Sequence, residues 1–266
     1  MSNGNLYQID PNAENPEAKV LIAMPGATAL TGFAQTGNDS YVVAGGVRGS
    51  YHYYNETLYS IDFSKNASGD FGVAATVPDA VMLNGAASLP GNENIILLAD
   101  SRVACVWRLD LTTGAYEKAI EGDFLSAPSN ATAPIGINGL KVTGSYAYFT
   151  NTYTGVYGRV PIDHDGYQTG DNEVIATVST SESWDDFYLM GPNGPSLNCQ
   201  SPDTVSMVSL NGTVTPIVGT GDTDGLLQGC SSITVSSGPM GNQSAYVVTK
   251  GTSSTGAGGQ VMRISL

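Results

Sequence analysis

A short pattern returns along the chain at nearly constant spacing, and this repeat constrains the fold more than any other feature. Each copy is a strand-like stretch that ends in an aliphatic residue, followed by Asp, Ser or Pro at the start of a turn. Copies end 48 to 56 residues apart, at Asp10, Asp62, Asp110, Pro161, Ser209 and Ser265. A period of about 50 residues is typical of one four-stranded propeller blade.

The segments between these markers share an internal order. A short strand follows each marker, and then come a strand of small residues, such as 83–89, and an apolar strand, such as 95–99. Small residues suit the strand nearest the axis of a propeller, where blades crowd together. We therefore predict an all-β fold, a six-bladed β-propeller with an incomplete first blade, as a single domain over residues 1–266. A β-sandwich with coincidental spacing is the alternative. Because a full first blade needs two strands before Leu6, either the chain is a fragment that lacks the N-terminal strands of this blade, or the ring is open by about half a blade. We favour the fragment.

Composition and charge exclude several classes of protein. Only 13% of the residues are charged, and 33 Gly and 13 Pro favour turns, so a helical bundle is ruled out. The net charge of −14 disfavours binding to nucleic acid or to anionic membranes, and no apolar run is long enough to span a bilayer. We expect a monomer or a weak homodimer.

Cysteine usage and glycosylation motifs indicate the secretory pathway. Zinc binding is disfavoured, because the three cysteines form no CxxC pair and only two histidines are present. Cys199 and Cys230 are expected near the same face of neighbouring blades, so we predict a disulfide between them, whereas Cys105 is predicted to be a buried free thiol. Six acceptor motifs favour a secreted glycoprotein, and they begin at Asn38, Asn55, Asn66, Asn130, Asn211 and Asn242.

Particular segments resemble a known family. Gly136-Ile-Asn-Gly-Leu140 and Tyr146-Ala-Tyr-Phe-Thr-Asn151 resemble a stretch of the gluconolactonase / senescence-marker-protein family of six-bladed propellers. Further segments, including Leu98-Ala-Asp-Ser101, Arg159-Val-Pro-Ile-Asp163 and Asp185-Asp-Phe187, resemble a fungal, largely secreted branch of that family. The few members of this branch with an assigned role resemble hetero-Diels–Alderases, which join tropolone-type quinone methides to terpenes such as humulene derivatives in secondary metabolism.

The resemblance also implies a candidate metal site. Asn84, Asn138 and Asp186 are expected at the entry to inner strands of three successive blades, and matching positions in metal-dependent lactonases supply oxygens to a divalent cation such as Ca²⁺. The further Glu ligand of that family comes from a segment that this chain lacks. Alternatively, the Asn-Gly pairs at 84–85 and 138–139 form tight turns and bind no metal. Asp185 and Asp186 should point to opposite faces of their strand, and we assign Asp186 to the funnel.

Other residues of the same loops suit a pocket for an apolar ligand with one or two carbonyl oxygens. We predict Arg102, Tyr51, Tyr153 and Asp186 as catalytic. We predict Asn84, Asn138, Arg48, Trp184 and Lys250 as ligand-binding. For any one of the aromatic residues, a place on a solvated strand is an equal alternative.

Three functions remain open on this evidence. The first is a cyclase of the hetero-Diels–Alderase type, which acts on a hydrophobic small-molecule substrate without a cofactor. The second is a Ca²⁺-dependent lactonase, and the third is a non-catalytic ligand-binding propeller. Nucleophilic catalysis has no support, because the sequence contains no Gly-x-Ser-x-Gly motif.

Overall fold

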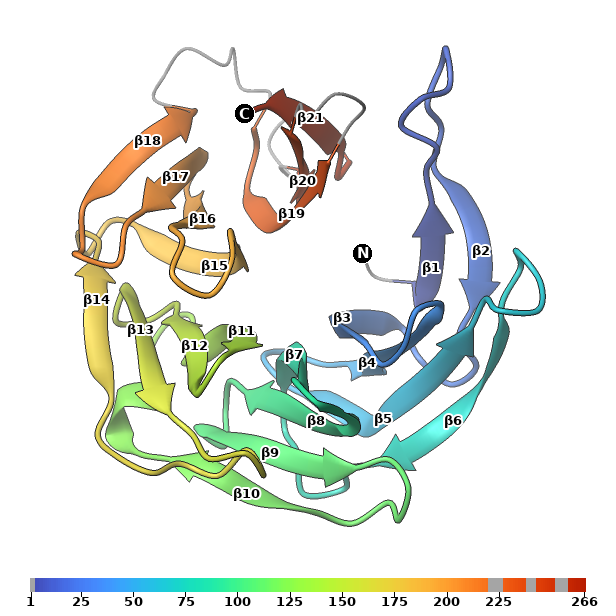
Figure 1. Ribbon diagram of the computed structural model, residues 1–266, viewed down its shortest axis with the longest axis horizontal. Helices are drawn as coiled ribbons and strands as arrows, with labels where there is room; N and C mark the ends of the chain where they lie inside the picture. Colours follow the sequence, from blue (N-terminus) through green and yellow to red (C-terminus); the bar gives the residue numbers. More distant parts are fainter. Residues whose placement is uncertain (1–2, 220–226, 238–242, 252–257) are drawn as a thin grey trace.

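The sheets of the protein are arranged around one central axis as a β-propeller (Figure 1). The computed structural model describes residues 3–219, 227–237, 243–251 and 258–266. Within each sheet the hydrogen-bonded order of the strands follows their order in the chain, and the first strand of each blade lies closest to the axis. All pairings between neighbouring strands are antiparallel.

Four blades have four strands each. The first contains β3 (Ala29–Gln35), β4 (Ser40–Arg48), β5 (Tyr53–Asp62) and β6 (Asp70–Thr76). The second contains β7 (Leu83–Leu89), β8 (Asn92–Asp100), β9 (Cys105–Asp110) and β10 (Tyr116–Glu121), and a 3₁₀ turn (Asp123–Leu125) follows it. The third contains β11 (Ile137–Thr143), β12 (Tyr146–Asn151), β13 (Val156–Pro161) and β14 (Glu173–Thr177). The fourth contains β15 (Ser183–Leu189), β16 (Ser196–Ser201), β17 (Thr204–Val208) and β18 (Val214–Val218).

The remaining strands form two smaller sheets. The fifth blade has three strands, β19 (Cys230–Ser237), β20 (Gln243–Thr249) and β21 (Val261–Ser265), and a separate ribbon pairs β1 (Asn5–Gln8) with β2 (Lys19–Ala23). The predicted all-β propeller is therefore confirmed, but the predicted six blades with an incomplete first blade are wrong, because the described residues form five blades and the ribbon. The spacing of the markers counted the ribbon as a blade, although in the described residues only β1 and β2 belong to it.

In the five blades, the repeated marker lies at the end of the third strand, and the first marker follows β1 of the ribbon. The Asp residues of the marker accept a hydrogen bond from the backbone N–H two residues further on, at 2.8 Å for Asp62 and Ser64 and at 2.7 Å for Asp110 and Thr112. This Asx-turn begins the connection to the outer strand. The backbone hydrogen bond from Thr112 lowers the pKa of Asp110. The Asp marker recurs because these units need the same turn at the same place.

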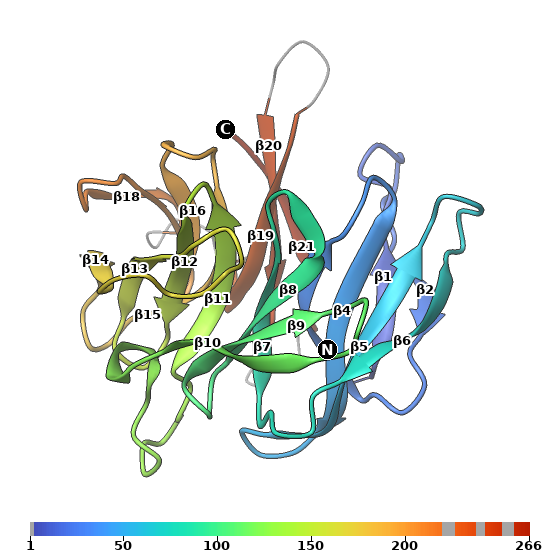
Figure 2. The ribbon, with the colours of Figure 1, turned by 60° about the horizontal axis from the view of Figure 1, so that its bottom comes forward.

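The hydrophobic core is divided among the contacts between neighbouring blades. One cluster joins Leu58 of β5 to Leu98 of β8, and the next joins Leu97 of β8 to Phe149 of β12. Each blade is twisted, as the turned view of Figure 2 shows, so its two faces can pack against both neighbours. In the part of the chain that the structure describes, no helix is long and apolar enough to cross a membrane.

The cysteines have the arrangement that the sequence analysis predicted. Cys199 of β16 and Cys230 of β19 form a disulfide between the fourth and fifth blades, with Cα atoms 5.2 Å apart. Cys105 is a buried free thiol on β9, and burial raises its pKa to about 12. The disulfide closes a loop with a sequence separation of 31 residues.

The inner strands of four blades carry the same irregularity. Two successive residues oppose one residue of the second strand, which is a β-bulge. These pairs are Thr31-Gly32, Asn84-Gly85, Asn138-Gly139 and Asp185-Asp186. Asn84 and Asn138 thus lie within β7 and β11, and the alternative that their Asn-Gly pairs form turns is wrong.

Glycine in these bulges permits a close approach between neighbouring blades. A Cβ atom added to Gly85 would lie 2.5 Å from the carbonyl oxygen of Asn138 and 2.5 Å from the backbone nitrogen of Leu140. A Cβ on Gly139 would lie 3.0 Å from the Cα of Asp186. The backbone of each bulge therefore packs directly against the next one around the axis.

We predict that Gly85→Ala destabilises the protein by about 1–3 kcal/mol, because the added methyl group has backbone atoms against it on the next blade. Gly72→Ala is the matched control: it lies on outer strand β6, where an added Cβ would find only the Ser60 hydroxyl, at 4.0 Å. Urea unfolding of both variants measures the difference. Equal stability of the two variants would contradict the close approach.

Candidate functional site

Polar side chains from the bulges of β11 and β15 meet at one end of the axis. The Asn138 side-chain amide nitrogen donates to Asp185 Oδ1 at 3.0 Å and to Thr152 Oγ1 at 2.8 Å. Lys250, which follows β20, places its ammonium nitrogen 2.9 Å from Asp185 Oδ2. Residues from the third, fourth and fifth blades therefore form one cluster, which we call the Asp185 cluster (Asn138, Thr152, Asp185 and Lys250).

Asp186 lies in a different environment, although it is next in the chain. Its Oδ1 pairs with the Lys141 ammonium at 2.6 Å, and its Oδ2 accepts from the Ser232 hydroxyl at 2.8 Å. Asp185, rather than the predicted Asp186, is thus the carboxylate that meets Asn138. The bulge shifts the alternation of side chains along β15, so a simple strand pattern could not choose between the two residues.

Asn84 belongs to a third group of contacts. Its side-chain amide donates to Ser101 Oγ at 3.2 Å, and Ser101 in turn donates to the carbonyl oxygen of Ile137 at 2.5 Å. The predicted metal set of Asn84, Asn138 and Asp186 is therefore not assembled, because each of the three side chains has its own partners. Within the described ranges, no group of three His, Cys, Asp or Glu residues could hold a metal ion.

The Asp185 cluster does not fit a resident divalent cation of the kind that the family resemblance implies. Its one carboxylate already faces the Lys250 ammonium, and Asn138 presents its nitrogen, not its oxygen, to that carboxylate. Ca²⁺ is bound by several oxygens that carry a net negative charge.

A pocket of about 250 Å³ is formed mainly by the segment between β4 and β5. Among its lining residues are Arg48, Tyr51, Tyr53, Met82 and Ile135. Two of the predicted residues, Arg48 and Tyr51, thus line one cavity. Tyr51 has a left-handed backbone conformation, with φ of 56°, within the tight connection that follows Arg48.

Arg102 and Tyr153 are connected to this pocket through the backbone. The Arg102 guanidinium donates to the carbonyl oxygen of Pro134 at 2.9 Å, and the backbone N–H of Tyr153 donates to the Ile135 carbonyl at 3.0 Å. Both residues hold the segment that supplies Ile135 to the pocket. The Tyr153 side chain itself is half-exposed.

Trp184, predicted as a ligand-binding residue, lies in the core. Its side chain is fully buried and belongs to the cluster that contains Tyr157 and Phe187. Its carbonyl oxygen, in contrast, accepts from Thr152 Oγ1 at 2.8 Å. The assignment of the indole to the pocket wall is therefore wrong, because the side chain of this residue points between the blades and only its backbone reaches the Asp185 cluster.

Glu56 is a candidate that the sequence analysis missed, and Tyr53 is a residue of the pocket loop to which it gave no role. Glu56 is buried, its Oε1 accepts from the Leu83 backbone N–H at 2.7 Å, and its Oε2 has no hydrogen-bond partner among the described residues. Burial raises the pKa of Glu56 to about 8. Burial also raises the pKa of Tyr53, with the charge of Arg48 opposing the shift and those of Glu56 and Asp185 adding to it. Tyr53 therefore lies within the electrostatic reach of both the pocket and the Asp185 cluster.

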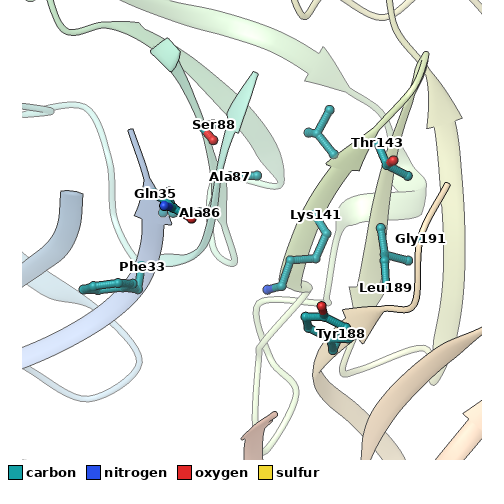
Figure 3. Close-up of a pocket in the computed structure, with 12 residues that line it drawn as sticks. Phe33, Gln35, Ala86, Ala87, Ser88, Lys141, Thr143, Tyr188, Leu189 and Gly191 are labelled. Carbon is teal, nitrogen blue, oxygen red and sulfur yellow. The ribbon is translucent and has the colours of Figure 1, made fainter. Parts of the chain in front are cut away.

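A second cavity, of about 310 Å³, lies among the inner strands beyond the bulges. In Figure 3, Phe33, Gln35 and the small residues 86–88 face Lys141, Tyr188 and Leu189 across it. Its only described lysine, Lys141, is the residue that pairs with Asp186. Small side chains leave this space open, and Lys141 reaches from its lining to Asp186 of the β15 bulge.

Comparison with known proteins confirms the predicted resemblance. The chain is 28% identical over 228 residues to a protein of Sarocladium schorii named as a hetero-Diels–Alderase, and 26% identical over 248 residues to one of a Phoma species with the same kind of name. These matches cover 73% and 84% of this chain but 56% and 70% of the relatives, so the chain spans little more than half of the first relative. No family model matches the sequence.

Solved structures show the same fold. The calcium-binding protein regucalcin of Agrobacterium tumefaciens superposes with a TM-score of 0.65 at 16% identity, over 98% of this chain and 82% of its own. The chain is therefore a propeller related in sequence to proteins named as hetero-Diels–Alderases, with the fold of the gluconolactonase-like proteins.

We predict that Glu56 makes the stability of the protein fall as pH rises. Its pKa of about 8 in the folded state, above the ordinary 4.5, means that the folded protein keeps a proton that the unfolded chain releases. The free energy of unfolding should therefore decrease between these two pH values, by up to about 1.4 kcal/mol per pH unit.

The test compares Glu56→Gln with Glu93→Gln, which changes an exposed residue of β8. Denaturant unfolding between pH 5 and 8 should show a shallower loss of stability for Glu56→Gln than for the wild type, and the control should follow the wild type. A Glu56→Gln variant with the wild-type pH dependence would show that this carboxyl is ionised in the folded protein.

Proposed function

We propose that the chain is a small-molecule enzyme, a secondary-metabolite cyclase of the hetero-Diels–Alderase type, with its site in the Arg48–Tyr53 pocket. The observation that carries this proposal is the similarity to two proteins with that name, each over most of this chain. The pocket supports it, because aromatic walls with one guanidinium suit an apolar ligand with a carbonyl group.

The proposed reaction needs positioning more than acid–base chemistry. A heterodiene with a conjugated carbonyl and an alkene form one carbon–carbon and one carbon–oxygen bond together, with no proton lost and no electron transferred to the protein. A hydrogen bond to the carbonyl oxygen lowers the barrier, and a pocket that holds both partners in reacting orientation lowers it further. The Arg48 guanidinium and the Tyr53 hydroxyl are the donors that we assign to this oxygen.

We predict that Arg48→Met lowers the rate acceleration by about 10- to 100-fold, which corresponds to about 1.4–2.7 kcal/mol of lost stabilisation. Arg159→Met is the matched control, because Arg159 pairs with Glu173 between β13 and β14. The assay mixes an ortho-quinone methide with a humulene-type alkene and measures the rate and the enantiomeric excess of the adduct by chiral chromatography.

Inclusion of EDTA separates the alternatives. Cycloaddition that continues in the presence of EDTA would support the cyclase. Lactone hydrolysis that EDTA abolishes would instead support the metal-dependent lactonase. Ligand binding without turnover of either substrate would leave a non-catalytic binding propeller. Equal rates for Arg48→Met and Arg159→Met, with the wild type active, would remove Arg48 from the mechanism.

We also propose that the protein acts in the secretory pathway or outside the cell. Five acceptor asparagines are exposed, namely Asn38, Asn55, Asn66, Asn130 and Asn211, while Asn242 lies outside the described residues. The Cys199–Cys230 disulfide suits an oxidising compartment. Expression behind a secretion signal in a fungal host should give glycoforms that collapse to one mass after treatment with N-glycosidase. Secreted protein with the unmodified mass would contradict glycosylation.

A further inference from the structure

Lys250 is held in place beside the buried carboxylate of Asp185. Its backbone N–H donates to the carbonyl oxygen of Gly229 at 2.8 Å, between the entry to β19 and the end of β20. Its side-chain stem runs along the same glycine, since a Cβ added to Gly229 would meet the Lys250 Cβ at 3.5 Å and its Cγ and Cδ at 3.7 Å. The ammonium is thus directed from the fifth blade to the axis.

The charge of Asp185 needs compensation where it lies. The Asp185 side chain is only 15% exposed, and burial raises its pKa, against the effects of Lys250 and of the hydrogen bond from Asn138. A buried carboxylate without a partner costs several kcal/mol. Either a bound cation or a cationic side chain must therefore stand beside it.

Two other carboxylates near the axis have partners of their own. Asp186, whose charge also raises the pKa of Asp185, is paired with Lys141. Glu56, whose pKa burial raises to about 8, accepts a hydrogen bond from the backbone N–H of Leu83. Asp185 and Lys250 together carry no net charge. A divalent cation beside them would bring two positive charges that no described neighbour of the cluster balances.

We propose that the Lys250 ammonium is the resident cation of the Asp185 cluster and occupies the place where a divalent cation would otherwise balance the charge of Asp185. The site is thereby a fixed hydrogen-bond donor: the Lys250 side chain is 55% exposed, so its ammonium can donate to an oxygen acceptor of a bound ligand. This inference rests on the contacts of Lys250 and not on the cyclase proposal. We therefore expect that chelators remove no metal ion from this site.

The test is whether removal of the ammonium creates a metal site. Lys250→Met keeps the length of the stem and removes the charge, so Asp185, Asn138 and Thr152 gain a place for Ca²⁺. Isothermal titration calorimetry with CaCl₂ should show one site, with a Kd of about 0.1–1 mM. The wild type and Lys250→Arg should show no saturable binding in the same range. Tb³⁺ luminescence sensitised by nearby tyrosine is a second readout.

The double variant Lys250→Met/Asp185→Asn is the control, and it should lose the acquired site. The melting temperature of Lys250→Met should rise with millimolar Ca²⁺, while that of the wild type should not change. Wild-type binding of one Ca²⁺ that Asp185→Asn abolishes would overturn the proposal. It would equally be overturned if both Lys250→Met and Lys250→Gln fold but acquire no binding. Neither result bears on the cycloaddition assay, so the two proposals fail separately.

Discussion

The close approach of the inner strands at the axis is the constraint on which the rest of the structure depends. Each blade must bring its first strand near those of its neighbours, and backbone atoms of one bulge touch the backbone of the next. Glycine at the second bulge position of β3, β7 and β11 makes this contact possible. The residue before each glycine is polar, so the packing that forms the ring also collects polar side chains at one level of the axis.

The fold could be predicted from the sequence because its repeat has a physical cause. The Asp that ends the third strand of several units is needed for the same Asx-turn, and it therefore recurs with the period of a blade. The number of blades was harder to predict from the sequence, because the first marker ends a strand of a two-stranded ribbon. The Asp of the turn marks the end of a strand, but it does not show whether that strand is paired with the inner strands of a blade.

The contacts of the predicted site residues could be derived from the sequence only in part. Asn138 of the third blade and Lys250 of the fifth blade both contact Asp185 of the blade between them. Asp185, not Asp186, contacts Asn138, because a bulge breaks the alternation of side chains along β15, and the Trp184 side chain is buried in the core between blades. Glu56 gives little signal in the sequence, since its burial depends on the Leu83 backbone of the next blade.

The cross-link between the fourth and fifth blades has a consequence for how the ring holds together. In the described strands, no pairing joins the three-stranded blade to the β1–β2 ribbon, so hydrogen bonding does not complete the circle there. The Cys199–Cys230 bond ties this terminal blade to its neighbour and disfavours the unfolded chain by about 3–4 kcal/mol through loop closure. Lys250 belongs to that same blade. A reducing environment would therefore loosen the terminal blade first, and with it the position of the Lys250 ammonium at the axis. Redox state and ligand recognition are thereby linked through a single disulfide.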